Sequence, residues 1–197
     1  MEKELKKIKN QVIQCTKCEL SETRNNSVPG KGNFKSDVIF VGEAPGKNED
    51  MKGEPFIGIA GKKLSMVLEN AGITRDDVYI TNIVKCRPPK NRVPTTNEKS
   101  TCQNYLEKEI AIIKPKIICI LGNTVFNSLL DGKEIIKFRG KIVRKNNQLY
   151  FLTIHPAATI YNQKLINVLK KDMKKLFRLI KELKDGNEIK IDIEYTS

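Results

Sequence analysis

Residues 37–58 read DVIFVGEAPGKNEDMKGEPFIG, and the rest of the chain is best interpreted from this stretch outward. Its first five residues are mostly β-branched or aromatic, which predicts a short buried strand. The loop that follows, 42–58, is rich in glycine and proline, which permit tight turns and close approach of the backbone to a ligand. Ligands of α/β sheets bind in the loops after the carboxyl ends of strands. The loop is therefore a candidate binding site, the alternative being a surface loop with solvated carboxylates.

Three further segments have the composition of buried strands, and helical segments alternate with them. The strands are expected at residues 78–84 (VYITNIV), 116–122 (KIICILG) and 149–154 (LYFLTI). Helices are expected at residues 2–14, 60–71, 97–113, 123–130 and 164–184. Such alternation is typical of a parallel sheet covered by helices. We therefore predict an α/β fold, a three-layer α/β/α sandwich around a central, mostly parallel four-stranded sheet.

The whole chain, residues 1–197, is expected to form a single domain, because its length suits one hydrophobic core.

Two segments have more than one interpretation. Residues 136–146 end near Asn146-Asn147, a pair typical of a hairpin turn, and are interpreted as two short antiparallel strands. The C-terminal tail, 185–197, either adds an edge strand or stays loose.

The chain carries a formal net charge of +13, with 36 basic and 23 acidic residues. A surface this basic favours a polyanionic partner, and nucleic acid is a better candidate than an anionic membrane. The alternative is that the lysines only solvate the outer faces of helices. The N-terminal residues lack the apolar core of a signal peptide, and no apolar run approaches membrane-spanning length. We expect a cytoplasmic protein.

Four of the five cysteines lie in predicted loops or at helix ends, namely Cys15, Cys18, Cys86 and Cys102. Cys119 falls inside a predicted strand and is interpreted as a small buried apolar residue. Thiols stay reduced in the cytosol, so the four are better interpreted as metal ligands than as disulfides. Sulfur-only ligation suits either zinc or an iron–sulfur cluster. The alternative is four unrelated reduced thiols.

Polar groups follow three of the predicted strands. Glu43 lies in the loop after the first, Asn82 near the end of the second, and His155 directly after the last. Carboxyl ends of parallel strands share one edge, so these groups are expected to converge on one pocket. Phe56, in the glycine-rich loop, can stack on a nucleobase. The alternatives are structural. His155 would then only stabilise the fold, and Phe56 would anchor its loop in the core.

Together these motifs resemble the family 4 uracil-DNA glycosylases, the iron–sulfur branch of archaea and bacteria. The resemblance covers residues 1 to about 180. The matching segments are GEAPG at 42–46 with Glu49-Asp50, PFIG at 55–58, TNIVKCRPP at 81–89, HPAA at 155–158, and the four cysteines. It implies a uracil-DNA glycosylase-like fold, and hydrolysis of the bond between uracil and deoxyribose. No lysine is placed so that it demands Schiff-base chemistry, so we expect hydrolysis without strand cleavage.

The resemblance also implies roles for individual residues. Phe56 stacks on the flipped uracil, Asn82 reads its polar edge, and His155 donates a hydrogen bond to the departing base. Gly42, Glu43 and Ala44 line the pocket. In the best-known branch of the superfamily an aspartate stands where this chain has Ala44. The candidates for positioning the water are therefore Glu43, Glu49 and Asp50, and the alternative is that no strong base is needed because the sugar cation is itself reactive.

Cofactor and partners follow from the same resemblance. One 4Fe–4S cluster is implied, held by Cys15, Cys18, Cys86 and Cys102. DNA containing uracil, single- or double-stranded, is the partner, and a monomer is expected. The resemblance places a segment that wedges into the duplex at residues 158–161. The phosphate contacts are expected from charge alone, at Lys85, Arg87, Lys90 and Arg92, with Lys31 and Lys35 upstream. The alternatives are a non-catalytic iron–sulfur nucleic-acid-binding module, a glycosylase for bases such as hypoxanthine, and a zinc-bound structural protein.

Overall fold

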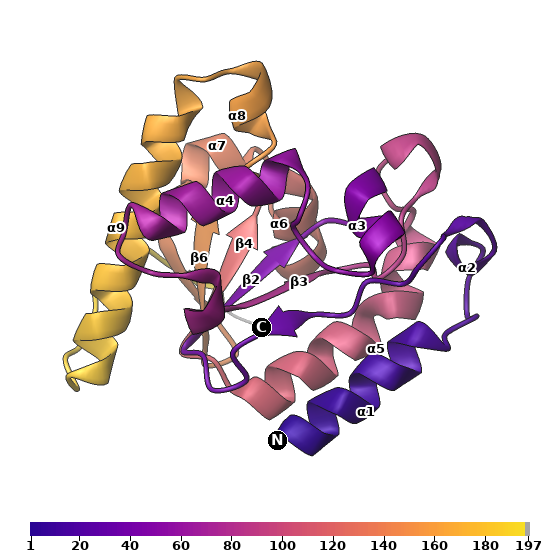
Figure 1. Cartoon of the computed structure of the whole chain (residues 1–197). Coiled ribbons are helices and arrows are strands. Elements are labelled where there is room, and N and C mark those ends of the chain that lie inside the picture. Colours follow the sequence, from indigo (N-terminus) through magenta and orange to yellow (C-terminus); the bar gives the residue numbers. More distant parts are fainter. Residues whose placement is uncertain (196–197) are drawn as a thin grey trace.

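A computed structural model describes residues 1–195 and has one seven-stranded sheet at its centre (Figure 1). The strand order is β1-β3-β2-β4-β6-β5-β7. The four middle strands are parallel to one another, and they are β3 (Tyr79–Asn82), β2 (Val38–Gly42), β4 (Ile117–Leu121) and β6 (Gln148–Thr153). They correspond to the four strands that the sequence predicts.

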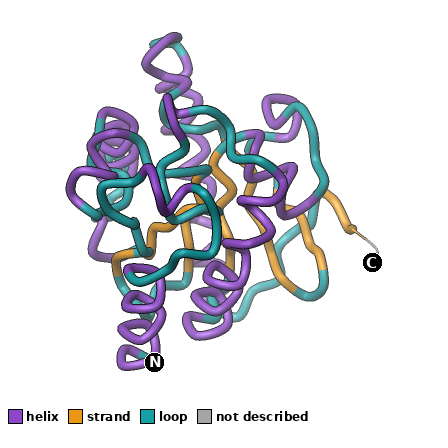
Figure 2. Tube along the Cα trace, turned by 90° about the vertical axis from the view of Figure 1, so that its right-hand side faces the viewer, coloured by secondary structure: helices purple, strands orange, loops and turns teal. Residues whose placement is uncertain are grey.

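Three short strands make the sheet wider than expected. β1 (Lys31–Gly32) pairs antiparallel with β3 at one edge. β5 (Ile142–Lys145) forms a hairpin with β6, and the turn is Asn146-Asn147, both with positive φ, as the hairpin interpretation requires. The first part of 136–146 is not a strand, because α7 (Ile135–Phe138) occupies it. β7 (Ile193–Tyr195) adds an outer edge strand beside β5 in the tail, whose last two residues, 196–197, lie outside the described part (Figure 2).

Helices cover both faces of the sheet, as the three-layer prediction requires (Figure 1). One layer is α1 (Glu2–Ile13), α5 (Thr96–Ile113) and α6 (Asn123–Leu130), and the other is α4 (Ile59–Glu69) and α9 (Leu165–Lys184). Alternate side chains of β2 enter the two cores: Ile39 and Val41 face the first layer, whereas Val38 and Phe40 face the second. The short helices are α2 (Leu20–Thr23), α3 (Lys47–Lys52) and α8 (Ala158–Tyr161), with 3₁₀ turns η1 (Arg75–Asp77) and η2 (Pro89–Asn91).

The glycine-rich loop after β2 contains α3, which its composition does not predict. The Glu49 carboxylate accepts hydrogen bonds from the backbone N–H of Gly46 (3.2 Å) and from that of Gly58 (2.7 Å). One side chain therefore ties the start of α3 to the end of the loop, and it fixes the path of the chain between them. No helix in residues 1–195 is both long and apolar enough to cross a membrane.

Candidate active site

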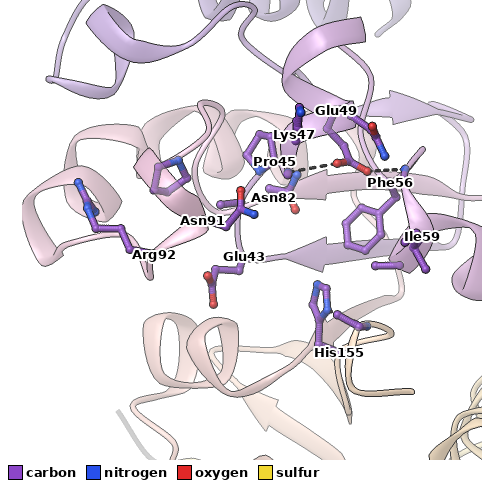
Figure 3. Close-up of a pocket in the computed structure, with 17 residues that line it drawn as sticks. Glu43, Pro45, Lys47, Glu49, Phe56, Ile59, Asn82, Asn91, Arg92 and His155 are labelled. Atoms are coloured by element: carbon purple, nitrogen blue, oxygen red, sulfur yellow. Dashed lines mark hydrogen bonds between the residues drawn. The ribbon is translucent and has the colours of Figure 1, made fainter. Parts of the chain in front are cut away.

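A pocket of about 440 Å³ opens at the carboxyl ends of β2, β3 and β6 (Figure 3). This volume lies within the range of about 300–1,000 Å³ typical of small-molecule sites. Glu43 and Phe56 lie in the loop after β2, Asn82 is at the end of β3, and His155 follows β6. These lining residues come from segments far apart in the sequence. The rest of the lining is Ala44 to Asn48, Glu49, Gly58 to Ala60, Pro88, Asn91, Arg92 and Ala157.

Asn82 is the last residue of β3, and only 1% of its surface is exposed. Its Oδ1 is buried and has no hydrogen-bond partner, alone among the buried side-chain oxygens and nitrogens of residues 1–195. An unpaired buried amide oxygen is costly, so a ligand with a donor group is expected to satisfy it. Gly42 lies directly beside it, since a Cβ there would sit 2.5 Å from Asn82 Oδ1 and 2.5 Å from Phe56 Cζ. The pocket therefore needs glycine at position 42.

The Phe56 ring forms a wall of the pocket next to the imidazole of His155. The centroids of the two rings are 5.7 Å apart, and their planes are inclined by 34°. Phe56 is 6% exposed, and its φ is +54°, in the left-handed region that an aromatic residue rarely adopts. An aromatic face beside an unpaired amide oxygen is a suitable surface for a flat heterocycle with polar edges.

His155 lies two residues beyond β6 and is held as a neutral imidazole. Desolvation lowers the pKa of His155 to about 4, and the charge of Glu49, the smaller effect, acts in the opposite direction. The Nδ1 atom accepts a hydrogen bond from the backbone N–H of Ala157 at 3.1 Å. Because a neutral imidazole has one N–H, the proton is assigned to Nε2. His155 thus offers a neutral donor to a pocket ligand.

Of the three acids considered for positioning water, two serve the fold. Both Glu49 oxygens accept backbone N–H groups within its own loop. Asp50 is 1% exposed, and it accepts hydrogen bonds from the backbone N–H of Asn25 (2.9 Å) and of Asn26 (3.3 Å). Glu43 remains; it lines the pocket, and its carboxylate points away from Glu49 (Figure 3).

The assignment of Lys85 to DNA phosphate is wrong, because this side chain is inside the protein, 1% exposed. Its ammonium donates to Glu109 (2.7 Å), to the Thr81 hydroxyl and to the Asn82 carbonyl oxygen (3.0 Å). Glu109 also accepts from the Gly30 backbone N–H and the Tyr79 hydroxyl, so the buried pair is fully hydrogen-bonded. The side chain stabilises the end of β3 from below the pocket and cannot reach a phosphate.

The other three basic residues of this loop lie on the surface beside the pocket. Arg92 lines the pocket and forms a two-pronged ion pair with Glu98 (2.8 and 2.6 Å). Arg87 Nε donates to Asn91 Oδ1 at 2.7 Å, and Lys90 is exposed. Asn91 and Pro88 also line the pocket, which their residue types do not predict. Their position just after the TNIVKC segment was the only available signal.

Cys15, Cys18, Cys86 and Cys102 line one small cavity between α1, the loop after β3 and α5. All four are free thiols, and Cys119 lies apart in β4. Arg24 donates from Nη1 to Cys86 Sγ (2.9 Å), and the backbone N–H of Lys85 donates to Cys102 Sγ (3.3 Å). Within residues 1–195 no three histidine, cysteine or acidic side chains meet closely enough to hold one metal ion. The cysteines therefore surround a cavity rather than a single point.

The sequence is similar to proteins of known activity. The sequence model described as the uracil DNA glycosylase superfamily matches residues 29–181. A type-4 uracil-DNA glycosylase of Sulfurisphaera tokodaii is 46% identical over 89% of this chain and 84% of that protein. Similar enzymes of the same type come from Saccharolobus solfataricus (43% identical, 94% of this chain, 88% of that protein) and Archaeoglobus fulgidus (42%, 87% and 91%).

Proposed function

The chain belongs to the uracil-DNA glycosylase superfamily, and on that premise we propose that it excises uracil from DNA. The reaction hydrolyses the bond between N1 of uracil and C1′ of deoxyribose. It leaves free uracil and an abasic site, the starting point of base excision repair. A base inside a duplex is out of reach of any pocket, so the uracil has to be flipped out of the stack.

The observation that carries this proposal is the buried, unpartnered Oδ1 of Asn82. Uracil presents an N3–H donor next to the O4 acceptor, and a side-chain amide offers the complementary acceptor and donor side by side. Cytosine has a bare N3 and an exocyclic amine in the same places. With Oδ1 facing the N3 position, cytosine would leave that oxygen unpaired in the pocket, which makes its binding less favourable. Phe56 provides the face on which the base stacks.

His155 acts on the leaving group. As the N1–C1′ bond breaks, its electron pair moves onto uracil, and negative charge builds up on the ring and its O2 oxygen. The Nε2–H of the neutral imidazole donates to that oxygen. A donor fixed in a desolvated pocket favours the transition state over the ground state, because the charge that it stabilises is small at first.

Glu43 acts at the sugar. Its carboxylate favours the positive charge that develops at C1′, and it accepts a proton from the water whose oxygen forms the new bond to C1′. Lys47 lies at the exposed rim of the pocket. The proposed reaction uses water and no lysine, so borohydride should trap no covalent protein–DNA adduct during turnover.

Arg87, Lys90 and Arg92 are proposed to bind DNA phosphates around the pocket mouth, and affinity should fall steeply with salt. The four cysteines are proposed to hold one 4Fe–4S cluster. Sulfur-only ligation fits this group, and the four thiols line one small cavity. Bound there, the cluster joins α1 to the loop after β3. We infer that the enzyme works as a monomer in the cytoplasm, where such thiols stay reduced.

One experiment tests the proposed function. The protein is incubated with a duplex that contains one uracil, and abasic sites are then cleaved with alkali. We expect strand cleavage for uracil in duplex and single-stranded DNA, and none for the same sequence with thymine. If protein with an intact visible absorption spectrum gives no cleavage product, the proposal is wrong. Cleavage of a hypoxanthine duplex in preference to the uracil duplex would assign a different base.

Replacing Asn82 with alanine should lower kcat/KM for uracil by about 10- to 100-fold, because hydrogen bonds to the base edge are lost. Asn82→Asp keeps the shape of the side chain but turns its N–H donor into a second acceptor. It should therefore lower the rate for uracil and reduce the preference for uracil over cytosine. Single-turnover rates with uracil and cytosine duplexes measure both effects. An unchanged uracil-to-cytosine ratio in both variants would contradict the reading of the base edge by Asn82.

Cys86→Ala should abolish the visible absorbance of the protein and weaken DNA binding about tenfold. The single-turnover rate at saturating DNA should change much less, because Cys86 precedes the phosphate-binding residues and lies outside the pocket. Cys119→Ala is the matched control, since Cys119 is buried in β4 and should leave the spectrum intact. A stable, colourless Cys86→Ala variant with unchanged DNA affinity would refute the structural role of the cluster.

A further inference from the structure

The backbone of Phe56 adopts an unfavourable conformation, which contacts with other residues have to hold in place. A φ of +54° is rare for any residue with a side chain, and bulky aromatic residues avoid it most. Such backbone strain persists only where the surroundings enforce it, and it is concentrated at functional sites. The surroundings of Phe56 therefore have to contain the groups that hold it.

Arg75, the first residue of η1, holds this backbone from outside the pocket. Its Nη1 donates to the Phe56 carbonyl oxygen at 2.8 Å, and its Nη2 donates to the Pro55 carbonyl oxygen at 2.8 Å. The fixed fork of a guanidinium binds two successive carbonyls with defined geometry, which a lysine ammonium cannot do. Arg75 is not among the residues that line the pocket, so it does not touch a base bound there.

The guanidinium of Arg75 is half-buried, and within residues 1–195 its hydrogen bonds go to uncharged oxygens. Besides the two carbonyls it approaches only the Ser65 hydroxyl, at 3.5 Å. Glu54, the acid whose charge acts most strongly on Arg75, instead pairs with Lys31 at 2.9 Å. A partly desolvated cation directed at two main-chain carbonyls, rather than at a carboxylate, indicates a positioning role.

Contacts from residues other than Arg75 also fix the chain around Phe56. A side chain at Gly61 of α4 would overlap the Phe56 carbonyl group, so α4 presses directly on this peptide. Beyond it, Glu49 holds the Gly58 backbone N–H. The ring itself rests against His155, 5.7 Å between centroids. Arg75 adds two hydrogen bonds to this set of contacts, on the Pro55 and Phe56 carbonyl oxygens.

We propose that Arg75 is a positioning residue for excision: it fixes the Pro55–Phe56 peptide so that the ring is ready as a stacking face before the base arrives. Preorganisation of this kind lowers the ordering cost of binding the flipped base. The inference rests on the proposed function, because it concerns the same pocket. Arg75 joins the residues proposed for excision, and it acts on the base only through Phe56.

The test uses Arg75→Ala and Arg75→Lys in the full chain, with three measurements. We expect inhibition by free uracil to weaken about tenfold and the single-turnover rate on uracil DNA to fall about tenfold. Affinity for a duplex without uracil should stay unchanged. The lysine variant should be as impaired as the alanine variant, because charge alone cannot hold both carbonyls. Millimolar guanidinium should restore part of the rate of Arg75→Ala and leave the wild type unaffected.

A double-mutant cycle with Phe56→Ala decides whether Arg75 acts through the ring. If it does, removing Arg75 from Phe56→Ala protein should cost less than twofold. A full tenfold loss in that background overturns the inference, as does wild-type behaviour of both Arg75 variants. If Arg75→Ala does not fold, the same double-mutant cycle is measured with Arg75→Lys. Arg144→Ala, whose partner Glu194 lies at the far edge of the sheet, is the matched control. Wild-type protein inactive on uracil DNA would instead refute the proposed function.

Discussion

Replacing His155 with alanine should slow uracil excision by about 10²–10³-fold at saturating DNA, with little change in DNA affinity. The loss corresponds to about 3–4 kcal/mol, the amount typical of a donor that acts on charge developing in the transition state. DNA affinity should persist because His155 is not among the residues proposed to bind DNA phosphates. Single-turnover rates and a binding titration measure the two effects separately.

His155→Gln is the informative control for this prediction. Glutamine keeps a neutral N–H donor but loses the link between Nδ1 and the Ala157 N–H. It should therefore recover part of the rate that alanine loses, while remaining slower than the wild type. Equal losses of rate and DNA affinity in His155→Ala would mean that His155 contributes to binding and not to the chemical step.

The pH dependence of the reaction follows from the same imidazole. Because the pKa of His155 is lowered to about 4, the neutral form is complete above about pH 5, and His155 adds no step to the rate profile near pH 6.5. The rate should fall only as pH approaches 4, where the imidazole gains a proton on Nδ1 and loses the Ala157 contact. The unfolded chain takes up this proton near pH 6.5, so the stabilising contribution of the neutral imidazole declines between about pH 6.5 and 4. The chain has one histidine, so one imidazole signal in NMR reports this pKa in untagged protein.

The central sheet and the position of the pocket could be predicted because they depend on local patterns. Each of the four parallel strands is a short apolar run flanked by turn residues, and the carboxyl ends of such strands share one edge. That rule alone brings Asn82 and His155, which are 73 positions apart in the sequence, to the same pocket. The edge strands β1 and β7 have two and three residues, too few to give a periodic signal.

The environment of charged side chains could not be predicted in this way. Glu49 and Asp50 look like solvated acids in the sequence, yet they accept backbone N–H groups from Gly58 and Asn25. Arg75 attracts no notice in the sequence, because its partners are main-chain carbonyls 19 and 20 positions earlier. Whether a charge faces solvent depends on tertiary contacts, and a hydrophobic pattern carries no information on them.

Lys85 is the clearest such case. The two prolines and four basic residues of 85–92 suggest an exposed basic loop, whereas Glu109, the partner of Lys85, lies on α5. Replacing Lys85 with methionine should lower the free energy of unfolding by about 3–5 kcal/mol, because the Glu109 carboxylate remains buried without its cation. For a chain of this length, that loss lowers Tm by roughly 6–20 °C. Lys31→Met, which breaks the exposed pair with Glu54, should cost less than about 1 kcal/mol.

A second variant separates the buried charge from the loss of packing. In Lys85→Met/Glu109→Gln the unpaired carboxylate is replaced by a neutral amide, so more than half of the lost stability should return. DNA binding gives an independent measurement. Because Lys85 reaches no phosphate, the slope of log K against log salt should stay unchanged in Lys85→Met, whereas Lys90→Met should reduce its magnitude by about 0.9. A reduced slope in Lys85→Met with wild-type stability would place this lysine on the DNA and not beneath Asn82.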